Sequence, residues 1–193
     1  MFLPIQIAAV LVVAALDAGV QVGSMTRADL ARPLVAGEGY QGVIFPTLPF
    51  NPKMYGADGS WGPSASDVGE FERLLRAALE GALRDPRSIV AHGCQPGESA
   101  AWAREYERRR KAEIKIILET LSAYRRQYAG VAMGSRRTLV VNFFPGAPSK
   151  IEDWHSTWRH EWVNVLGGGT GYWGISFDVQ EKRFHDFYAN SPR

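Results

Sequence analysis

The sequence predicts an α+β domain in which two helices pack on an antiparallel β-meander of about five strands. Between residues 64 and 121, apolar side chains recur at intervals of three and four, which is typical of amphipathic helices. Beyond residue 124 the period changes to two, which is typical of half-buried strands. The 193 residues therefore suit a single domain at 64–193, preceded by two segments of different composition, 1–24 and 25–63.

The first segment, residues 1–24, is signal-like or an anchor. No charge occurs before Asp17, and the apolar core from Ile5 to Leu16 is followed by small residues, as in an export signal. The run is shorter than the roughly 20 apolar residues that span a bilayer, and no span is predicted beyond it. No basic residue precedes the run, so three interpretations stay open: a cleaved or retained export signal, a buried element of the fold, or a true start at Met25. The first predicts a periplasmic or secreted protein, free or tethered by this segment, and the last a cytoplasmic one.

The second segment, residues 25–63, is rich in glycine and proline and is predicted to be extended. Proline lacks a backbone N–H and fixes φ, so a long helix is excluded here. A short strand is predicted over residues 40–45. The prolines that carry this prediction are Pro46, Pro49, Pro52 and Pro63.

Two helices are predicted next. The first begins at Ser64, which forms a capping box pattern with Asp67, and ends at Asp85–Pro86. The second runs from about residue 98 to residue 121. Its middle part, 104–115, holds six basic and three acidic residues.

The strands of the meander are predicted from alternating apolar and polar residues. The predicted strands lie at 124–129, 138–144, 161–166, 172–178 and 183–188. The run Gly167–Gly171 predicts a hairpin between the third and fourth of them, because glycine accepts the positive φ of tight reversals. A phosphate loop is the alternative, but such a loop opens a helix and needs a nearby lysine. Here a strand is predicted to follow.

The order of these motifs resembles a family of small uncharacterised bacterial α+β proteins that are often exported. The shared motifs are Trp61–Pro63, YRRQYAG at 124–130, VVNFF at 140–144, EWVNVLGGGTGYWGISFD at 161–178, and a final aromatic strand before Asn190. The resemblance covers about residues 60–190 and consists of turns, aromatic residues and strand ends. It implies the fold and export, but no activity is known for the family and it supplies no catalytic residues.

A metal-dependent or histidine-based hydrolase is one hypothesis for the function. His155, His160 and Glu161 are its candidate ligands, with His185 as a possible third imidazole. The spacing differs from HExxH, in which two histidines four residues apart share one helix face and the glutamate lies between them. The tryptophans around them favour a core edge instead. No metal and no cofactor is therefore predicted.

A binding surface is the second hypothesis. Tryptophan marks either a core rim or a binding face, and paired arginines suit a carboxylate or phosphate. The candidate binding residues are Trp154, Trp158, Trp173, Arg125 and Gln127. His92 and Cys94, two residues apart in the sequence, have the residue types of a base and a nucleophile. A loop cysteine without a role is favoured.

The charge balance bears on nucleic acid as a partner. The net charge is only +2, so no global field gathers polyanions, and glutamates interrupt the basic helix. Binding through residues 104–115 is therefore a disfavoured alternative. The sequence best fits a non-catalytic exported binding or inhibitor-like module. Its partner is not predicted, and another protein is one candidate.

Overall fold

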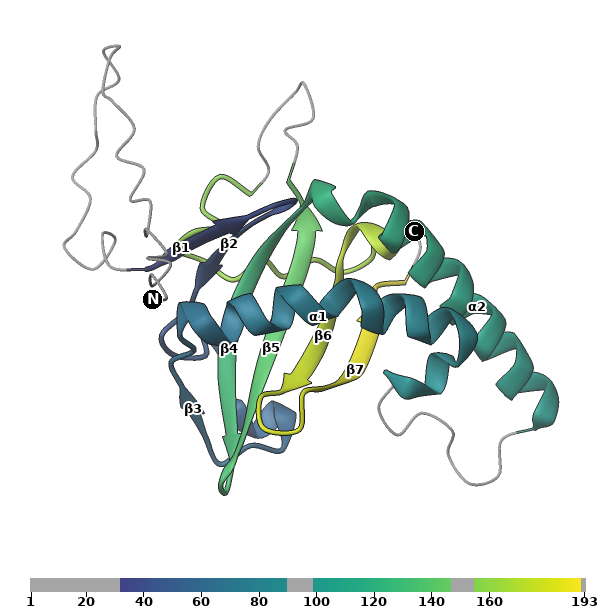
Figure 1. Cartoon of the computed structure of the whole chain (residues 1–193), viewed down its shortest axis with the longest axis horizontal. Coiled ribbons are helices and arrows are strands. Elements are labelled where there is room, and N and C mark those ends of the chain that lie inside the picture. The colour runs from purple at the N-terminus through teal and green to yellow at the C-terminus, as the bar shows by residue number, and fades with distance from the viewer. Residues whose placement is uncertain (1–31, 90–98, 147–154, 192–193) are drawn as a thin grey trace, which may run out of the picture. The chain divides into compact units, whose positions relative to one another are not determined.

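The computed structural model describes residues 32–89, 99–146 and 155–191, which belong to the compact unit Ala31–Arg193 (Figure 1). It confirms an α+β fold with two helices, but the sheet in the described ranges has seven strands and not five. The strands are β1 (Leu34–Gly37), β2 (Tyr40–Ile44), β3 (Gly59–Trp61), β4 (Tyr124–Met133), β5 (Arg136–Pro145), β6 (Trp173–Asp178) and β7 (Arg183–Ala189). The helices are α1 (Ala65–Arg84) and α2 (Ala100–Thr120). Short 3₁₀ turns lie at Pro52–Tyr55 (η1), Pro86–Ser88 (η2), Leu121–Ala123 (η3) and Gly169–Gly171 (η4).

The strand order is β1-β2-β4-β5-β6-β7, and β3 pairs with the far half of β4. All pairs are antiparallel except β2–β4, which is parallel in the register Val43 opposite Gln127. The long hairpin β4–β5 forms the centre of the sheet and aligns Tyr128 with Val141. Because β2 and β3 share one edge of β4, segments from the glycine-rich and proline-rich region lie beside the centre of the sheet.

Helix α1 forms as predicted. The Ser64 hydroxyl accepts a hydrogen bond from the Asp67 amide, and the Asp67 carboxylate accepts one from the Ser64 amide, which satisfies two free donors of the first turn. The helix ends at Arg84, and its C-cap Asp85 stands immediately before a proline. Figure 1 shows α1 crossing the face of the sheet over β4 to β7.

The principal core lies between this face and the helices. Phe71 of α1 is fully buried and contacts the rings of Tyr128, Phe143, Phe177 and Phe184, with centroid distances of 5.4 to 6.4 Å. Burying one such side chain contributes about 1.5–3 kcal/mol. None of the helices within the described ranges is long and apolar enough to cross a membrane.

A second core covers the opposite face of β2, β4 and β5. Its buried members are Val43, Phe45, Leu48, Ala57, Ala129, Val131, Val140, Phe144 and Trp158. They come from the sheet, from the segment before β3 and from the segment between β5 and β6. The sheet therefore has helices on one face and irregular segments on the other.

The predicted hairpin at Gly167–Gly171 is wrong. Residues 161–168 form no strand, and β6 pairs with β5 and β7 only. The glycines do adopt positive φ, at 88° for Gly167 and 86° for Gly168, but they form an irregular turn that leads into η4. The physical reason is that side chains bind this segment: Asn190 Nδ2 donates to the carbonyls of Val165 and Gly167.

Candidate functional site

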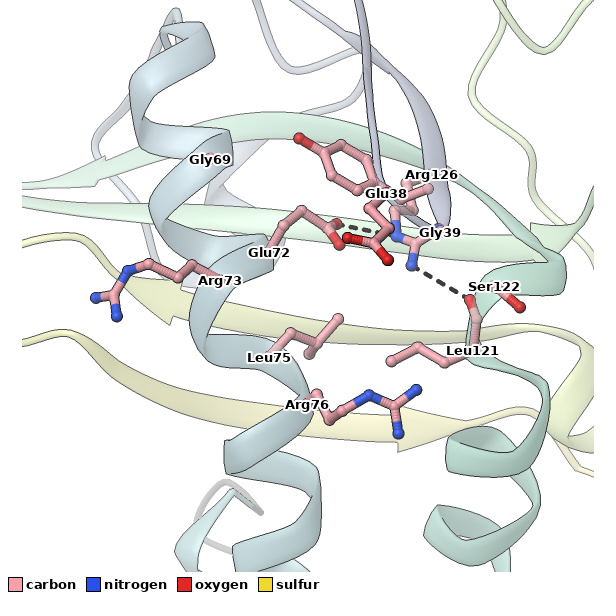
Figure 2. Close-up of a pocket in the computed structure, with 11 residues that line it drawn as sticks. Glu38, Gly39, Gly69, Glu72, Arg73, Leu75, Arg76, Leu121, Ser122 and Arg126 are labelled. Carbon is pink, nitrogen blue, oxygen red and sulfur yellow. Dashed lines mark hydrogen bonds and ion pairs between the residues drawn. The ribbon is translucent and has the colours of Figure 1, made fainter. Parts of the chain in front are cut away.

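A cavity of about 300 Å³ opens between α1, the β1–β2 turn and η3 (Figure 2). Glu38 and Tyr40 bound it on the sheet side, and Glu72 and Arg76 bound it on the helix side. Leu121 of η3 closes the remaining side. Gly69 also lines it, and an added Cβ there would meet no atom within 4 Å. The helix therefore leaves the entrance open at that position.

A buried ion pair lies at the base of this cavity. The side chain of Arg126 is 2% exposed and that of Glu72 is 9% exposed, and Arg126 Nε lies 2.9 Å from Glu72 Oε1. Tyr128 donates a 2.7 Å hydrogen bond to the same Oε1. The sequence places these groups together because residues 126 and 128 share the helix-side face of β4 by strand alternation.

The other two nitrogens of Arg126 are also used. Nη1 donates to the carbonyl of Tyr124 at 2.8 Å, and Nη2 donates to the carbonyl of Leu121 at 3.2 Å. The guanidinium also lies over the rings of Tyr40 and Phe143, at 5.5 and 5.2 Å. Arg126 is therefore fixed within the protein by its ion pair with Glu72 and by two hydrogen bonds to backbone carbonyls.

The two oxygens of the Glu72 carboxylate differ in their partners. Oε1 contacts Tyr128 and Arg126, whereas Oε2 has no hydrogen-bond partner among the described residues. Burial raises the pKa of Glu72 above its ordinary value, although Arg126 and Tyr128 act in the opposite direction. Burial also raises the pKa of Tyr128 well above 10, and the Glu72 carboxylate adds to the rise. The cavity thus holds a carboxylate with spare acceptor capacity in a place where its charge is costly.

Two charged side chains of opposite sign stand on opposite sides of the cavity entrance, Arg76 on α1 and Glu38 on the β1–β2 turn. Figure 2 shows Arg76 extending from α1 toward the segment with Leu121, whereas Arg73 points away from the cavity. Arg76 reaches Glu80 only at 3.9 Å and is more than half exposed, so this pair is weak and the guanidinium can serve a ligand. Glu38 lies across from it on the β1–β2 turn.

The tryptophans that the sequence singled out have different positions. Trp173 is fully buried and stacks on Phe143 with ring centroids 3.6 Å apart. Trp158 is 3% exposed and packs in the second core near Phe144. Trp154 lies outside the described residues, as do Cys94 and His92. The two described rings are thus core elements of opposite faces.

Gln127 and Arg125 lie on the second face. Gln127 is fully buried, and its amide nitrogen donates to the carbonyls of Trp158 and Glu161 at 2.6 Å each. Its oxygen accepts from the Val163 amide and from Asn142 Nδ2. Arg125 lies over the Trp158 ring at 5.3 Å. These residues fix the 155–163 segment on the sheet.

The structure does not bring the candidate metal ligands together. His155 Nε2 lies 3.0 Å from the hydroxyl of Tyr172, and Glu161 accepts a 2.8 Å hydrogen bond from Thr157. His185 lies on β7 and is bonded to Asp186. Within residues 32–89, 99–146 and 155–191, no group of three or more His, Cys, Asp or Glu side chains could hold a metal ion.

The basic helix forms a partial stripe. Arg104, Lys111 and Lys115 lie at i, i+7 and i+11, which places them on one line of α2, and no ion pair to them occurs in the described part of the chain. Glu113 instead pairs with Arg109 and Arg110 at 2.8 and 2.7 Å.

Sequence reasoning missed Glu72, Arg126 and Tyr128 as a group. The alternation of β4 gives one usable signal, because it places Arg126 and Tyr128 on the same apolar face, where an arginine needs a buried partner. The identity of that partner, 54 residues away on α1, follows only from the packing of the helix.

No family model, curated protein or solved structure matches the chain. The resemblance to small exported bacterial proteins therefore stays a prediction.

Proposed function

We propose that the protein is a non-catalytic binding module and that the cavity beside Glu72 is its recognition site. The observation that carries the proposal is a carboxylate, nine-tenths buried, that faces an open cavity with one oxygen unpartnered among the described residues. A carboxylate that is mostly buried carries a desolvation cost, and a ligand that brings a charged N–H donor to it offsets that cost.

The walls favour a small zwitterionic ligand, such as a free amino acid or a short peptide. An ammonium group suits Glu72 and Glu38, a carboxylate suits Arg76, and the apolar surface of Leu75 and Leu121 suits a hydrocarbon side chain. A volume of about 300 Å³ restricts the ligand to this size class. Each of these interactions is a binding interaction and needs no chemical step.

The proposal extends to an exported protein, because the apolar run of residues 5–16 has the composition of an export signal. In that setting, a small soluble ligand or the free end of a partner peptide would reach the cavity from outside the cytoplasm. An inhibitor-like role would use the same site, with the N-terminal ammonium group of the partner chain near Glu72 and Glu38.

The test is an amide NMR titration with L-leucine and two truncated analogues, 3-methylbutylamine and 4-methylpentanoic acid. Leucine is expected to shift the amides of Gly39, Gly69 and Ser122 in a saturable way. Each analogue lacks one charged group and is expected to bind about tenfold more weakly, since a charge-assisted hydrogen bond contributes roughly 1.5–3 kcal/mol. Equal shifts from all three probes, or none from leucine at about 10 mM, would contradict the proposal.

Three variants locate the binding. Glu38→Gln and Arg76→Gln each remove one exposed rim charge and are expected to weaken leucine binding without a large loss of stability. Gly69→Leu is expected to block the entrance sterically, and Gly81→Leu on the same helix is the matched control that should leave binding intact, because Gly81 does not line the cavity.

A second candidate function, binding of a polyanion, is supported by the line of Arg104, Lys111 and Lys115 on α2. Fluorescence anisotropy with a single-stranded oligonucleotide tests it. Binding that falls steeply with salt and is lost in Lys111→Gln/Lys115→Gln would support this function, and affinity unchanged by these substitutions would exclude the helix as the site.

A further inference from the structure

A second cavity of about 300 Å³ lies on the face of the sheet opposite α1 and α2. Its lining residues are Tyr55, Val140, Ile175, Ser176, Asp186 and Tyr188. Val140 belongs to the second core and pairs with Ser176 across β5 and β6, so both side chains project from this face. The cavity is therefore separated from the Glu72 site by the sheet itself.

The cavity forms because β6 has the small residues Gly174 and Ser176 beside the large Tyr188 of β7. Gly174 pairs with Tyr188, and an added Cβ at Gly174 would lie 2.6 Å from the Tyr188 ring. The aromatic ring thus lies across the glycine. Tyr55 of η1 provides the second aromatic side chain, and Phe50 supports it by stacking at a centroid distance of 5.4 Å.

The backbone of β7 directs a carboxylate to the same place. The pairing of β6 with β7 shifts register between Gly174 and Ser176, and Asp186 has a φ of 54°. A positive φ is uncommon outside glycine and is best tolerated by Asn and Asp. His185 Nδ1 lies 2.7 Å from Asp186 Oδ2 and holds the carboxylate in position.

Three oxygen-bearing side chains, those of Tyr55, Asp186 and Tyr188, line the same cavity. Burial raises the pKa of Tyr55 to about 12, and the charges of Tyr188 and Asp186 add to the rise. No lysine or arginine is among the residues that line the cavity in the described part of the chain. The lining thus combines two tyrosine side chains with one carboxylate, and the cavity is large enough for a small organic molecule.

We propose that this cavity binds an organic cation of the alkylammonium or quaternary ammonium class. Aromatic faces attract such cations through the ring quadrupole, and a nearby carboxylate adds a Coulombic attraction that a neutral ligand of equal shape does not receive. This inference is independent of the proposed function, because it uses other residues on the other face of the sheet.

The test compares choline with its uncharged carbon isostere, 3,3-dimethylbutan-1-ol, by amide NMR at pH 8. Choline is expected to shift the amides of Gly174, Ser176 and Tyr188 and to bind at least about tenfold more tightly than the isostere. Equal binding of the two probes shows an apolar pocket only and would overturn the proposal. The absence of any shift at about 50 mM choline would overturn it as well.

Two variants separate charge from structure. Asp186→Asn removes the carboxylate but keeps a residue that accepts positive φ, and it is expected to weaken choline binding about tenfold. Glu181→Gln changes the net charge equally on the neighbouring turn, outside the lining, and is expected to leave choline binding unchanged. Equal loss in both variants would show a general charge effect and contradict the assigned site. Leucine titration of the same samples distinguishes this cavity from the Glu72 site.

Discussion

Replacing Arg126 with methionine is the substitution that most severely tests the described architecture. Methionine has a similar length but no charge, so it leaves Glu72 with only the Tyr128 hydroxyl and leaves the carbonyls of Leu121 and Tyr124 without the donors that now reach them. Removing one partner of a buried pair costs about 3–5 kcal/mol of folding free energy, because the remaining charge stays buried. We expect Arg126→Met to lose stability in this range at pH 8.

The loss should depend on pH with a definite sign. Burial already raises the pKa of Glu72, so protonation of the folded state removes the cost of the buried charge. Loss of Arg126 should raise that pKa further, since the guanidinium now lowers it. The penalty of Arg126→Met is therefore expected to be smaller at pH 5 than at pH 8.

A double-mutant cycle isolates the pair. Glu72→Met/Arg126→Met removes both charges, and the double variant is expected to be more stable than Arg126→Met alone by about 1.5 kcal/mol or more. The exposed pair on the same helix supplies the control: Arg73→Met breaks the 2.9 Å bond to Glu70 and should cost less than about 1 kcal/mol. Urea unfolding followed by tryptophan fluorescence measures the wild type, Glu72→Met, Arg126→Met and the double variant, together with the Arg73→Met control. A cost below about 1 kcal/mol for Arg126→Met, or strict additivity in the cycle, would refute the buried pair.

Three further predictions follow from individual residues. Gly69→Ala should raise stability by about 0.5–1 kcal/mol in urea unfolding, as should Gly81→Ala, because both glycines lie inside α1 and an added Cβ meets nothing. Gln127→Leu should lower stability by about 2–4 kcal/mol, because four hydrogen bonds end on this buried amide, whereas Gln41→Leu at an exposed position of β2 should change it by less than about 1 kcal/mol. If the signal is cleaved, exported protein recovered from its host should start near residues 19–24, and N-terminal sequencing that finds an intact Met1 on cytoplasmic protein would contradict export.

The local features of the fold were predictable from the sequence. Ser64 and Asp67 predict the start of α1, Asp85–Pro86 predicts its end, and the apolar stripe predicts its buried face, because each signal acts within a few residues. The strands β1 and β3 were not predicted, since they have four and three residues and lie in a glycine-rich and proline-rich segment. Their pairing with β2 and β4 stabilises them, and that pairing is not local.

The wrong hairpin has a similar explanation. Residues 161–166 alternate like a strand, but Gln127, Asn142 and Asn190 supply the backbone hydrogen bonds that a partner strand would have supplied. A sequence pattern shows which side chains alternate and does not show which group satisfies the backbone. The same limit applies to the cavity, because Glu72 and Arg126 are distant in the sequence and their opposition depends on how α1 crosses β4.

The most direct test of the central claim is a ¹³C NMR titration of the Glu72 side-chain carboxyl, with and without L-leucine. In the free protein, burial raises the pKa of Glu72 above its ordinary value, so the carboxyl is expected to titrate at higher pH than an exposed glutamate. Bound ammonium stabilises the carboxylate, so leucine is expected to lower that pKa, while 4-methylpentanoic acid, which lacks the ammonium, should not. A Glu72 titration that is ordinary in the free protein and unchanged by leucine would contradict the assignment of this cavity as the recognition site.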